Sequence, residues 1–119
     1  MGINIFLCGK VGVGLIAKVC NNMAVAIEMI GVSEALALGK SLGMDLNILS
    51  RIMTASSSRC FIVDTYNPVP GILKNSPASK NYEIGFYCYL MLKDVKLALE
   101  VAREAKCKTE LGDHSKEIY

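Results

Sequence analysis

A long apolar segment, residues 12–42, reads GVGLIAKVCNNMAVAIEMIGVSEALALGKSL. Apolar side chains recur along it every three or four residues, which is the period of an α-helix. The regular positions are Ile16, Val19, Met23, Ile27 and Ile30. We therefore predict one long, largely buried helix over Leu15–Leu42, with a glycine at position 31 where it could bend.

Shorter segments on either side complete an all-α domain that one strand precedes. Ile3–Cys8 is a β-branched apolar run ended by a glycine, and a strand without a partner in its own chain belongs to a sheet elsewhere. Helices are predicted after the N-cap Asp45 and over Phe86–Ala105, and a further helix begins at Leu111. Asp64–Pro77 holds all three prolines and is predicted as one ordered loop.

The composition limits the classes of protein and of site. The 13 basic and 11 acidic residues give a net charge of +2 without a block of one sign, so a nucleic-acid surface is not expected. Charged residues interrupt every apolar run before the roughly 18 residues that a membrane span needs, so no membrane partner is expected. Five cysteines without a C-x-x-C spacing support neither a disulfide framework nor a zinc site, and no metal is expected.

The glycines at the start of the long helix allow two interpretations. The segment from Gly12 to Ala17, with Gly14 between them, fits the G-x-G-x-x-G/A fingerprint of dinucleotide-binding folds, where a helix N-terminus holds a pyrophosphate. That fingerprint needs a second parallel strand that ends in an acidic residue about 20 positions on, whereas here the helical pattern continues. Glycines that only let the chain turn tightly into a buried helix are therefore the favoured interpretation.

Three polar side chains interrupt the apolar pattern of this helix. Lys18, Asn21 and Asn22 stand at i, i+3 and i+4, so they share one face. Burial of an ammonium and two amides costs free energy without partners, and burial lowers the pKa of a lysine toward neutrality, which suits proton transfer. An asparagine one turn away would then hold a substrate against the amine. The alternative, which periodicity alone favours, is that Lys18 extends into solvent while an asparagine hydrogen-bonds a neighbouring loop.

Three segments in the same order resemble one enzyme family. The residues from Gly12 to Asn22 match the G-x-G-x-x-x-K-x-x-x-N signature of the β-hydroxyacid dehydrogenases. Two further segments resemble the 3-hydroxyisobutyrate dehydrogenases within that family: Arg59-Cys60 followed by Asp64-Thr65-Tyr66-Asn67-Pro68-Val69-Pro70-Gly71, and Gly85-Phe86 followed by Leu90-Met91 and Lys93-Asp94. The resemblance covers essentially the whole chain.

The first segment implies a role for each matching residue. Lys18 would be the catalytic acid/base, taking the proton from the substrate hydroxyl as hydride passes to the nicotinamide. Asn22, with Asn21 beside it, would orient the substrate. Gly12 and Gly14 would form a hinge at which the substrate approaches the backbone.

The third segment implies three more site residues. Phe86 and Asp94 would line the substrate site, and Lys93 would reach the cofactor from this domain. Their spacing of i, i+7 and i+8 predicts one face of one helix; without the resemblance, Lys93 and Asp94 would be interpreted as a solvated pair. Similar enzymes have a glycine in place of Ser58 and Trp-Ser-Ser at residues 61–63, so the sequence leaves the substrate preference open.

The resemblance also implies a larger protein. The fold would be the helical C-terminal domain of the 6-phosphogluconate dehydrogenase type, with residues 1–12 as the end of a Rossmann domain and hinge, and residues 13–119 as a truncated substrate and dimerisation domain. The reaction would be NAD-dependent oxidation of 3-hydroxyisobutyrate to methylmalonate semialdehyde in valine catabolism, with NADP as the other candidate cofactor. The partners would be the small hydroxyacid, the absent Rossmann domain and further copies in a homo-oligomer.

The expected location is the mitochondrial matrix in a eukaryote and the cytoplasm otherwise. This domain alone should not turn over, because nothing in it fixes a nicotinamide within hydride reach of the substrate. Two alternatives remain at this point. One is a non-catalytic helical interaction module that dimerises through its long apolar helix, and the other is a reductase of a different short hydroxyacid.

Overall fold

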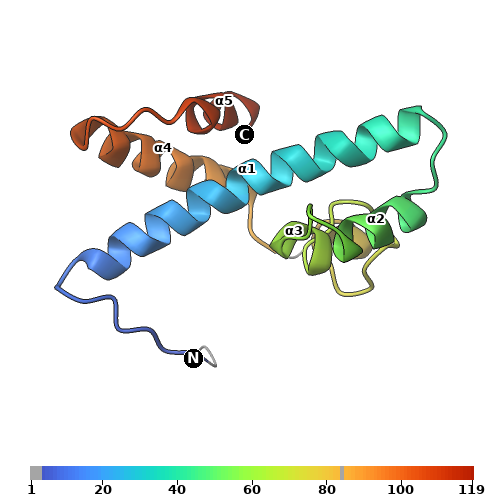
Figure 1. The fold of residues 1–119 in the computed structure, drawn as a ribbon, viewed down its shortest axis with the longest axis horizontal. Coiled ribbons are helices and arrows are strands. Elements are labelled where there is room, and N and C mark those ends of the chain that lie inside the picture. Colours follow the sequence, from blue (N-terminus) through green and yellow to red (C-terminus); the bar gives the residue numbers. More distant parts are fainter. Residues whose placement is uncertain (1–3, 84) are drawn as a thin grey trace.

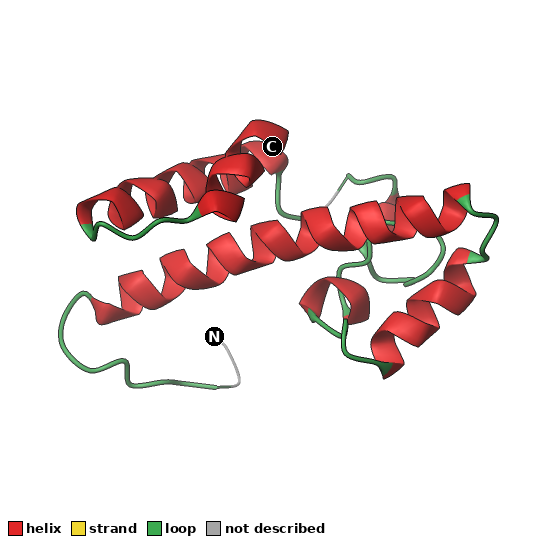
Figure 2. Ribbon diagram, turned by 45° about the horizontal axis from the view of Figure 1, so that its top comes forward, coloured by secondary structure: helices red, strands yellow, loops and turns green. Residues whose placement is uncertain are grey.

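The computed structural model describes residues 4–83 and 85–119. Its helical elements are α1 (Val13–Ser41), α2 (Leu46–Ala55), α3 (Phe61–Asp64), the 3-10 turn η1 (Pro77–Lys80), α4 (Cys88–Glu104) and α5 (Glu110–Ile118). Helix α1 crosses the molecule, with α4 and α5 along one side of it and α2 and α3 along the other (Figure 1, Figure 2). Within the described ranges there are helices and no strand, so the all-α prediction is confirmed.

Helix α1 is a single helix of 29 residues, close to the predicted range and unbroken at Gly31. It ends where the sequence predicts, because Gly43 adopts a φ of 81° that other residues rarely take. The Gly43 N–H donates to the Lys40 carbonyl at 3.0 Å, and the Met44 N–H donates to the Gly39 carbonyl at 2.9 Å. This pair of hydrogen bonds is a Schellman motif, which satisfies carbonyls that the helix end would leave free.

The prediction that α1 is largely buried is wrong for the described chain. Only Val19, Ala26, Val32 and Leu36 are buried, while Ile16 is 53% exposed. The reason is that α4 and α5 pack on one side of α1 and α2 and α3 on the other (Figure 1), so much of its surface stays uncovered, and residues 13–18 are all exposed. By length and mean hydropathy α1 would also pass for a membrane span, but it carries Glu28 and Glu34, and four helices pack on it. We interpret it as the central helix of a helical domain.

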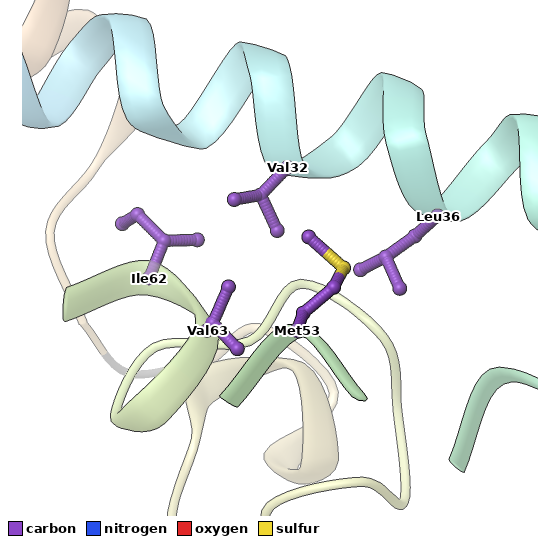
Figure 3. Close-up of a cluster of buried hydrophobic side chains, with 5 residues drawn as sticks. All are labelled: Val32, Leu36, Met53, Ile62 and Val63. Atoms are coloured by element: carbon purple, nitrogen blue, oxygen red, sulfur yellow. The ribbon is translucent and has the colours of Figure 1, made fainter. Parts of the chain in front are cut away.

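Two hydrophobic cores share α1. In the first core Val32 and Leu36 face Met53 of α2 and Ile62 and Val63 of α3 (Figure 3). Ile62 and Val63 are each 1% exposed, and full burial of such side chains contributes about 1.5–3 kcal/mol each. Helix α3 has four residues, and nothing in the sequence analysis predicted it. It brings two adjacent apolar side chains onto α1.

The second core lies between α1 and α4. Ala26, which is fully buried, faces Met91, Val95 and Leu99 of α4. A methyl side chain at position 26 lets the two helices approach closely, and α4 runs back along the N-terminal half of α1 (Figure 1). This packing direction brings α4 alongside the polar face of α1.

Helix α2 begins after its N-cap residue, as predicted. The Asp45 side chain accepts a hydrogen bond of 2.7 Å from the Asn47 N–H, which is N-cap geometry. This bond and a second one from the Asn47 side chain lower the pKa of Asp45. The helix ends at Ala55, before the run of serines.

The proline-rich segment is ordered, as predicted, and a buried amide holds it. Asn67 is 1% exposed; its Nδ2 donates to Ser50 Oγ at 2.8 Å, and its Oδ1 accepts from the Val69 N–H at 3.0 Å. The Tyr82 hydroxyl donates to the Pro68 carbonyl at 2.9 Å. These bonds satisfy polar groups that the loop would otherwise bury without partners.

The predicted N-terminal strand is not present in residues 4–8, and Ile3 lies outside the described residues. Residues 4–8 have no regular structure, and Ile5 and Leu7 are 91% and 96% exposed. A strand forms by hydrogen bonding to a neighbouring strand, and residues 4–83 and 85–119 contain none. The apolar pattern was therefore insufficient to make a strand in this chain.

Candidate active site

The polar face of α1 meets a buried carboxylate on α4. Asn22 Nδ2 donates a hydrogen bond of 2.8 Å to Asp94 Oδ2, although the two residues lie 72 positions apart in the chain. Asp94 is 8% exposed, and Asn22 is half-buried. A buried carboxylate needs partners to offset the loss of hydration, so this bond joins the two helices at a defined point.

The second oxygen of Asp94 is also occupied. Lys93 Nζ lies 3.1 Å from Asp94 Oδ1, and the Lys93 side chain is 67% exposed. Burial raises the pKa of Asp94, but hydrogen bonds from Lys93 and Asn22 and the charges of Lys93 and Lys18 outweigh burial, so the pKa lies below its usual value of 3.8. Asp94 is therefore an anion at neutral pH, and Lys93 and Asp94 form a half-buried pair instead of the solvated pair of the alternative interpretation.

Lys18 stands one turn before Asn22 on α1. Helical spacing puts it on the same face as Asn22, and its positive charge contributes to lowering the pKa of Asp94. Lys18 is exposed, so the premise of a buried lysine does not hold in the described chain. Residues 13–18 of α1 are all exposed, and Val19 is the first buried residue of the helix.

The amide of Asn22 has a fixed orientation. Its Nδ2 must face Asp94, because an ionised carboxylate only accepts hydrogen bonds. Its Oδ1 accepts from Asn21 Nδ2 at 3.3 Å, and Asn21 is exposed. One N–H of Asn22 and one lone pair of its oxygen remain for a ligand beside Lys18.

The two glycines lie at the open end of this face. Gly12 caps α1 with a φ of 94°, and a Cβ added at Gly14 would meet no heavy atom within 4 Å. Gly14, Lys18 and Asn22 follow one another at intervals of four residues, so they share a face of α1. The absence of a side chain at Gly14 leaves the surface beside Lys18 open.

The structure does not place Phe86 on the same helix face as Lys93 and Asp94. Helix α4 begins at Cys88, so Phe86 lies in the turn before it, and the prediction from helical spacing is wrong for this residue. The Phe86 side chain is 47% exposed, and its N–H donates to Tyr66 Oη at 2.6 Å. No sequence pattern indicated a role for Tyr66, because a tyrosine in an irregular loop carries no periodic signal.

Lys18 and Asn22 lie one turn apart on α1, and Asn22 hydrogen-bonds Asp94 of α4. These are residues for which the resemblance to the β-hydroxyacid dehydrogenases implied roles in the site. The family model described as "NAD-binding of NADP-dependent 3-hydroxyisobutyrate dehydrogenase" matches residues 12–119. The chain therefore belongs to the 3-hydroxyisobutyrate dehydrogenase family, as the resemblance predicted.

Individual relatives agree with this assignment. Over all of its 119 residues the chain is 48% identical to the mitochondrial 3-hydroxyisobutyrate dehydrogenase of Homo sapiens, of which it covers 35%. It is 44% identical to the NAD-dependent L-serine dehydrogenase of Pseudomonas aeruginosa, of which it covers 40%. The solved structure of Mycobacterium tuberculosis 3-hydroxyisobutyrate dehydrogenase with L-serine matches 98% of this chain and 40% of its own length, with a TM-score of 0.93 and 38% identity. The chain thus spans roughly a third to two fifths of these relatives.

Proposed function

We propose that this chain supplies the catalytic-lysine domain of an NAD-dependent dehydrogenase that oxidises 3-hydroxyisobutyrate to methylmalonate semialdehyde. The observation that supports the proposal most directly is the Asn22–Asp94 hydrogen bond, which holds an oriented amide one turn from Lys18. The 48% identity to the human relative over the whole chain supports the choice of reaction.

In the proposed mechanism each residue has one task. Lys18 Nζ takes the proton from the substrate hydroxyl during oxidation and returns it in the reverse direction. Asn22 binds the substrate through the amide N–H and the oxygen lone pair that Asp94 and Asn21 leave free. Asp94 keeps that amide oriented, and Gly14 leaves room for the substrate beside Lys18. Phe86 borders the substrate site from the turn before α4.

One residue of this chain, Lys93, is suited to bind a nicotinamide dinucleotide. Lys93 is 67% exposed and uses one of its three N–H donors on Asp94, so the others can reach a carboxamide or a phosphate. When bound, the dinucleotide would accept the hydride from the carbon that bears the hydroxyl. NAD is the proposed cofactor because the Pseudomonas relative is named NAD-dependent, and NADP is the second candidate because the family model is described as NADP-dependent.

The relatives point to one substrate class. 3-Hydroxyisobutyrate and L-serine are both propanoates with a hydroxyl on carbon 3, and they differ in a methyl or an ammonium group on carbon 2. The proposed site therefore recognises a 3-hydroxypropanoate through its carboxylate and hydroxyl, and the group on carbon 2 sets the preference. A reductase of another short hydroxyacid is the nearest alternative.

The proposed organisation follows from the exposed surface. Residues 1–12 would be a hinge to a Rossmann domain, and residues 13–119 would form the substrate and dimerisation domain. Leu15 and Ile16, on the first turns of α1, are 62% and 53% exposed and would be covered by that domain or by a second copy. The same exposed residues support the second candidate function, a non-catalytic interaction module. In a eukaryote we propose a mitochondrial location in the matrix, which agrees with the word mitochondrial in the names of relatives. The proposed place in valine catabolism rests on the resemblance of the sequence.

A chimera tests the proposed function. These 119 residues would replace the matching segment of the human relative, and NADH formation would be measured with 3-hydroxyisobutyrate and with L-serine. We expect activity with at least one of them, and we expect Lys18→Ala to lower kcat by about 10²–10⁴-fold, the usual contribution of general acid–base catalysis. Lys40→Ala, a lysine in the last turn of the same helix, is the matched control and should leave kcat within about twofold. A folded chimera whose Lys18→Ala variant keeps full activity would contradict the mechanism.

A further inference from the structure

The turn that leads into α4 is packed against a tyrosine from another loop. Gly85 adopts a φ of 125°, and a Cβ added there would collide with the Tyr66 hydroxyl and lie 2.7 Å from Pro77 Cγ. Tyr66 Oη accepts a hydrogen bond of 2.6 Å from the Phe86 N–H. The backbone just before α4 is thus held by a side chain 20 residues earlier in the chain.

Tyr66 is itself fixed at its other end. Its ring stacks on the Phe61 ring, with centroids 5.9 Å apart and planes inclined by 24°, and it packs against the first core. Helix α4 has no side-chain cap of its own at Tyr87. The Tyr66 hydroxyl therefore contacts the backbone two residues before the first residue of α4.

This arrangement connects the first core to the candidate active site. Tyr66 rests on the core formed by α1, α2 and α3, whereas Phe86 leads directly into α4, which carries Lys93 and Asp94. The loops around positions 66–68 and 82–86 are also joined by the Tyr82–Pro68 hydrogen bond, which does not involve Phe86. Of these two bonds, the Tyr66 bond is the one that holds the backbone of Phe86, which the proposed function places at the substrate site.

We propose that Tyr66 is a positioning residue: by accepting the Phe86 N–H it sets the place of the Phe86 ring and thereby the fit of the substrate. The proposal rests on the proposed function, because it assumes that Phe86 borders the substrate. Tyr66 acts through Phe86 and is not itself required to touch the substrate.

Tyr66→Phe and Tyr82→Phe make a matched pair for the test. Each removes one hydroxyl and one hydrogen bond between the same two loops, and Tyr66→Phe keeps the ring that stacks on Phe61. In the 119-residue chain, amide hydrogen exchange followed by NMR should show faster exchange of the Phe86 N–H in Tyr66→Phe, by about fivefold or more for the loss of one hydrogen bond. Tyr82→Phe should leave that amide unchanged.

Kinetics in the chimera test the consequence for the substrate. Tyr66→Phe should raise KM for the hydroxyacid about fivefold with a smaller change in kcat, while Tyr82→Phe should change neither. Unchanged exchange of the Phe86 amide would overturn the proposal, and so would faster exchange with an unchanged KM. If the unsubstituted chimera is folded but inactive, the proposed function fails, and the exchange experiment still decides whether Tyr66 holds Phe86.

Discussion

The most constrained residue of the candidate site is Asp94. It is nearly buried, yet it stays ionised because each of its oxygens has a partner, Lys93 on its own helix and Asn22 on α1. Removal of one partner of a buried hydrogen-bonded charge usually costs more than the bond itself contributes, because the remaining group stays desolvated. Asp94 therefore controls both the approach of two helices and the orientation of one amide.

Substitution of Asp94 tests this double role. Asp94→Asn keeps the size of the side chain but removes its charge, so the Asn22 amide loses a charged acceptor worth about 1.5–3 kcal/mol. We expect kcat/KM in the chimera to fall about tenfold or more. Leu92→Asn, a half-buried neighbour on the same helix that makes no such bond, serves as a control for general effects on α4. An unchanged kcat/KM in Asp94→Asn would contradict the role of Asp94.

The same substitution should change the acid stability. The pKa of Asp94 is lower in the folded chain than its usual 3.8, so its ionised form stabilises the fold above that pH. This contribution is lost as the pH falls through the folded pKa. The melting temperature of the unsubstituted chain should therefore drop below about pH 4, and Asp94→Asn should lack that part of the drop.

At the residue scale the sequence predicted which side chains of α1 share a face, but not how deeply they lie. Lys18, Asn21 and Asn22 are neighbours on α1 because helical spacing demands it. Whether Lys18 is buried depends on what packs over the first turns of α1. The period of the apolar residues does not show what packs there. The role of Tyr66 could not be predicted, because its hydrogen bond depends on the path of two irregular loops.

At the scale of elements, the helix ends were predictable because single residues encode them. Asp45 and Gly43 mark one helix start and one helix end through side-chain and backbone geometry that a short sequence motif specifies. Helix α3 was not predictable, since four residues are too few to show a period. The strand prediction for residues 4–8 was wrong because a strand needs a partner as well as a pattern.

The N-cap of α2 at Asp45 can be tested by substitution. Asp45→Ala removes the acceptor of the Asn47 N–H and should lower the midpoint of urea unfolding, whereas Asp45→Asn keeps an N-cap oxygen and should lower it less. Because hydrogen bonds from Asn47 lower the pKa of Asp45, the difference between the unsubstituted chain and Asp45→Ala should shrink as the pH falls through that pKa. A difference that is constant from pH 7 to pH 2 would contradict the cap.

At the scale of the whole molecule, one helix serves two separate cores. Val32 and Leu36 belong to the core with α2 and α3, and Ala26 belongs to the core with α4. The sequence predicted a long, largely buried helix in an all-α domain. It did not show that the packing divides into two cores, because that division is set by contacts between residues far apart in the chain.

A larger side chain at Ala26 should separate α4 from α1. Ala26 is fully buried against α4, so Ala26→Leu overpacks this core and should cost about 1–3 kcal/mol of unfolding free energy in urea. It should also raise KM in the chimera by displacing Asp94 from Asn22. Ala24→Leu, at an exposed position two residues away on the same helix, should cost less than about 0.5 kcal/mol. Equal effects of the two substitutions would refute the close packing at Ala26.

The division into two cores sets an order of assembly during synthesis. Every residue of the first core precedes position 70, so it can form while α4 is still being translated. The second core needs α4 and is closed by Tyr119, whose hydroxyl donates to the Ala26 carbonyl at 3.3 Å. We therefore expect a nascent chain whose first core has left the ribosome to lack the Asn22–Asp94 contact until α4 follows. We expect the residues proposed for catalysis to come together only when the last helices of this chain have left the exit tunnel.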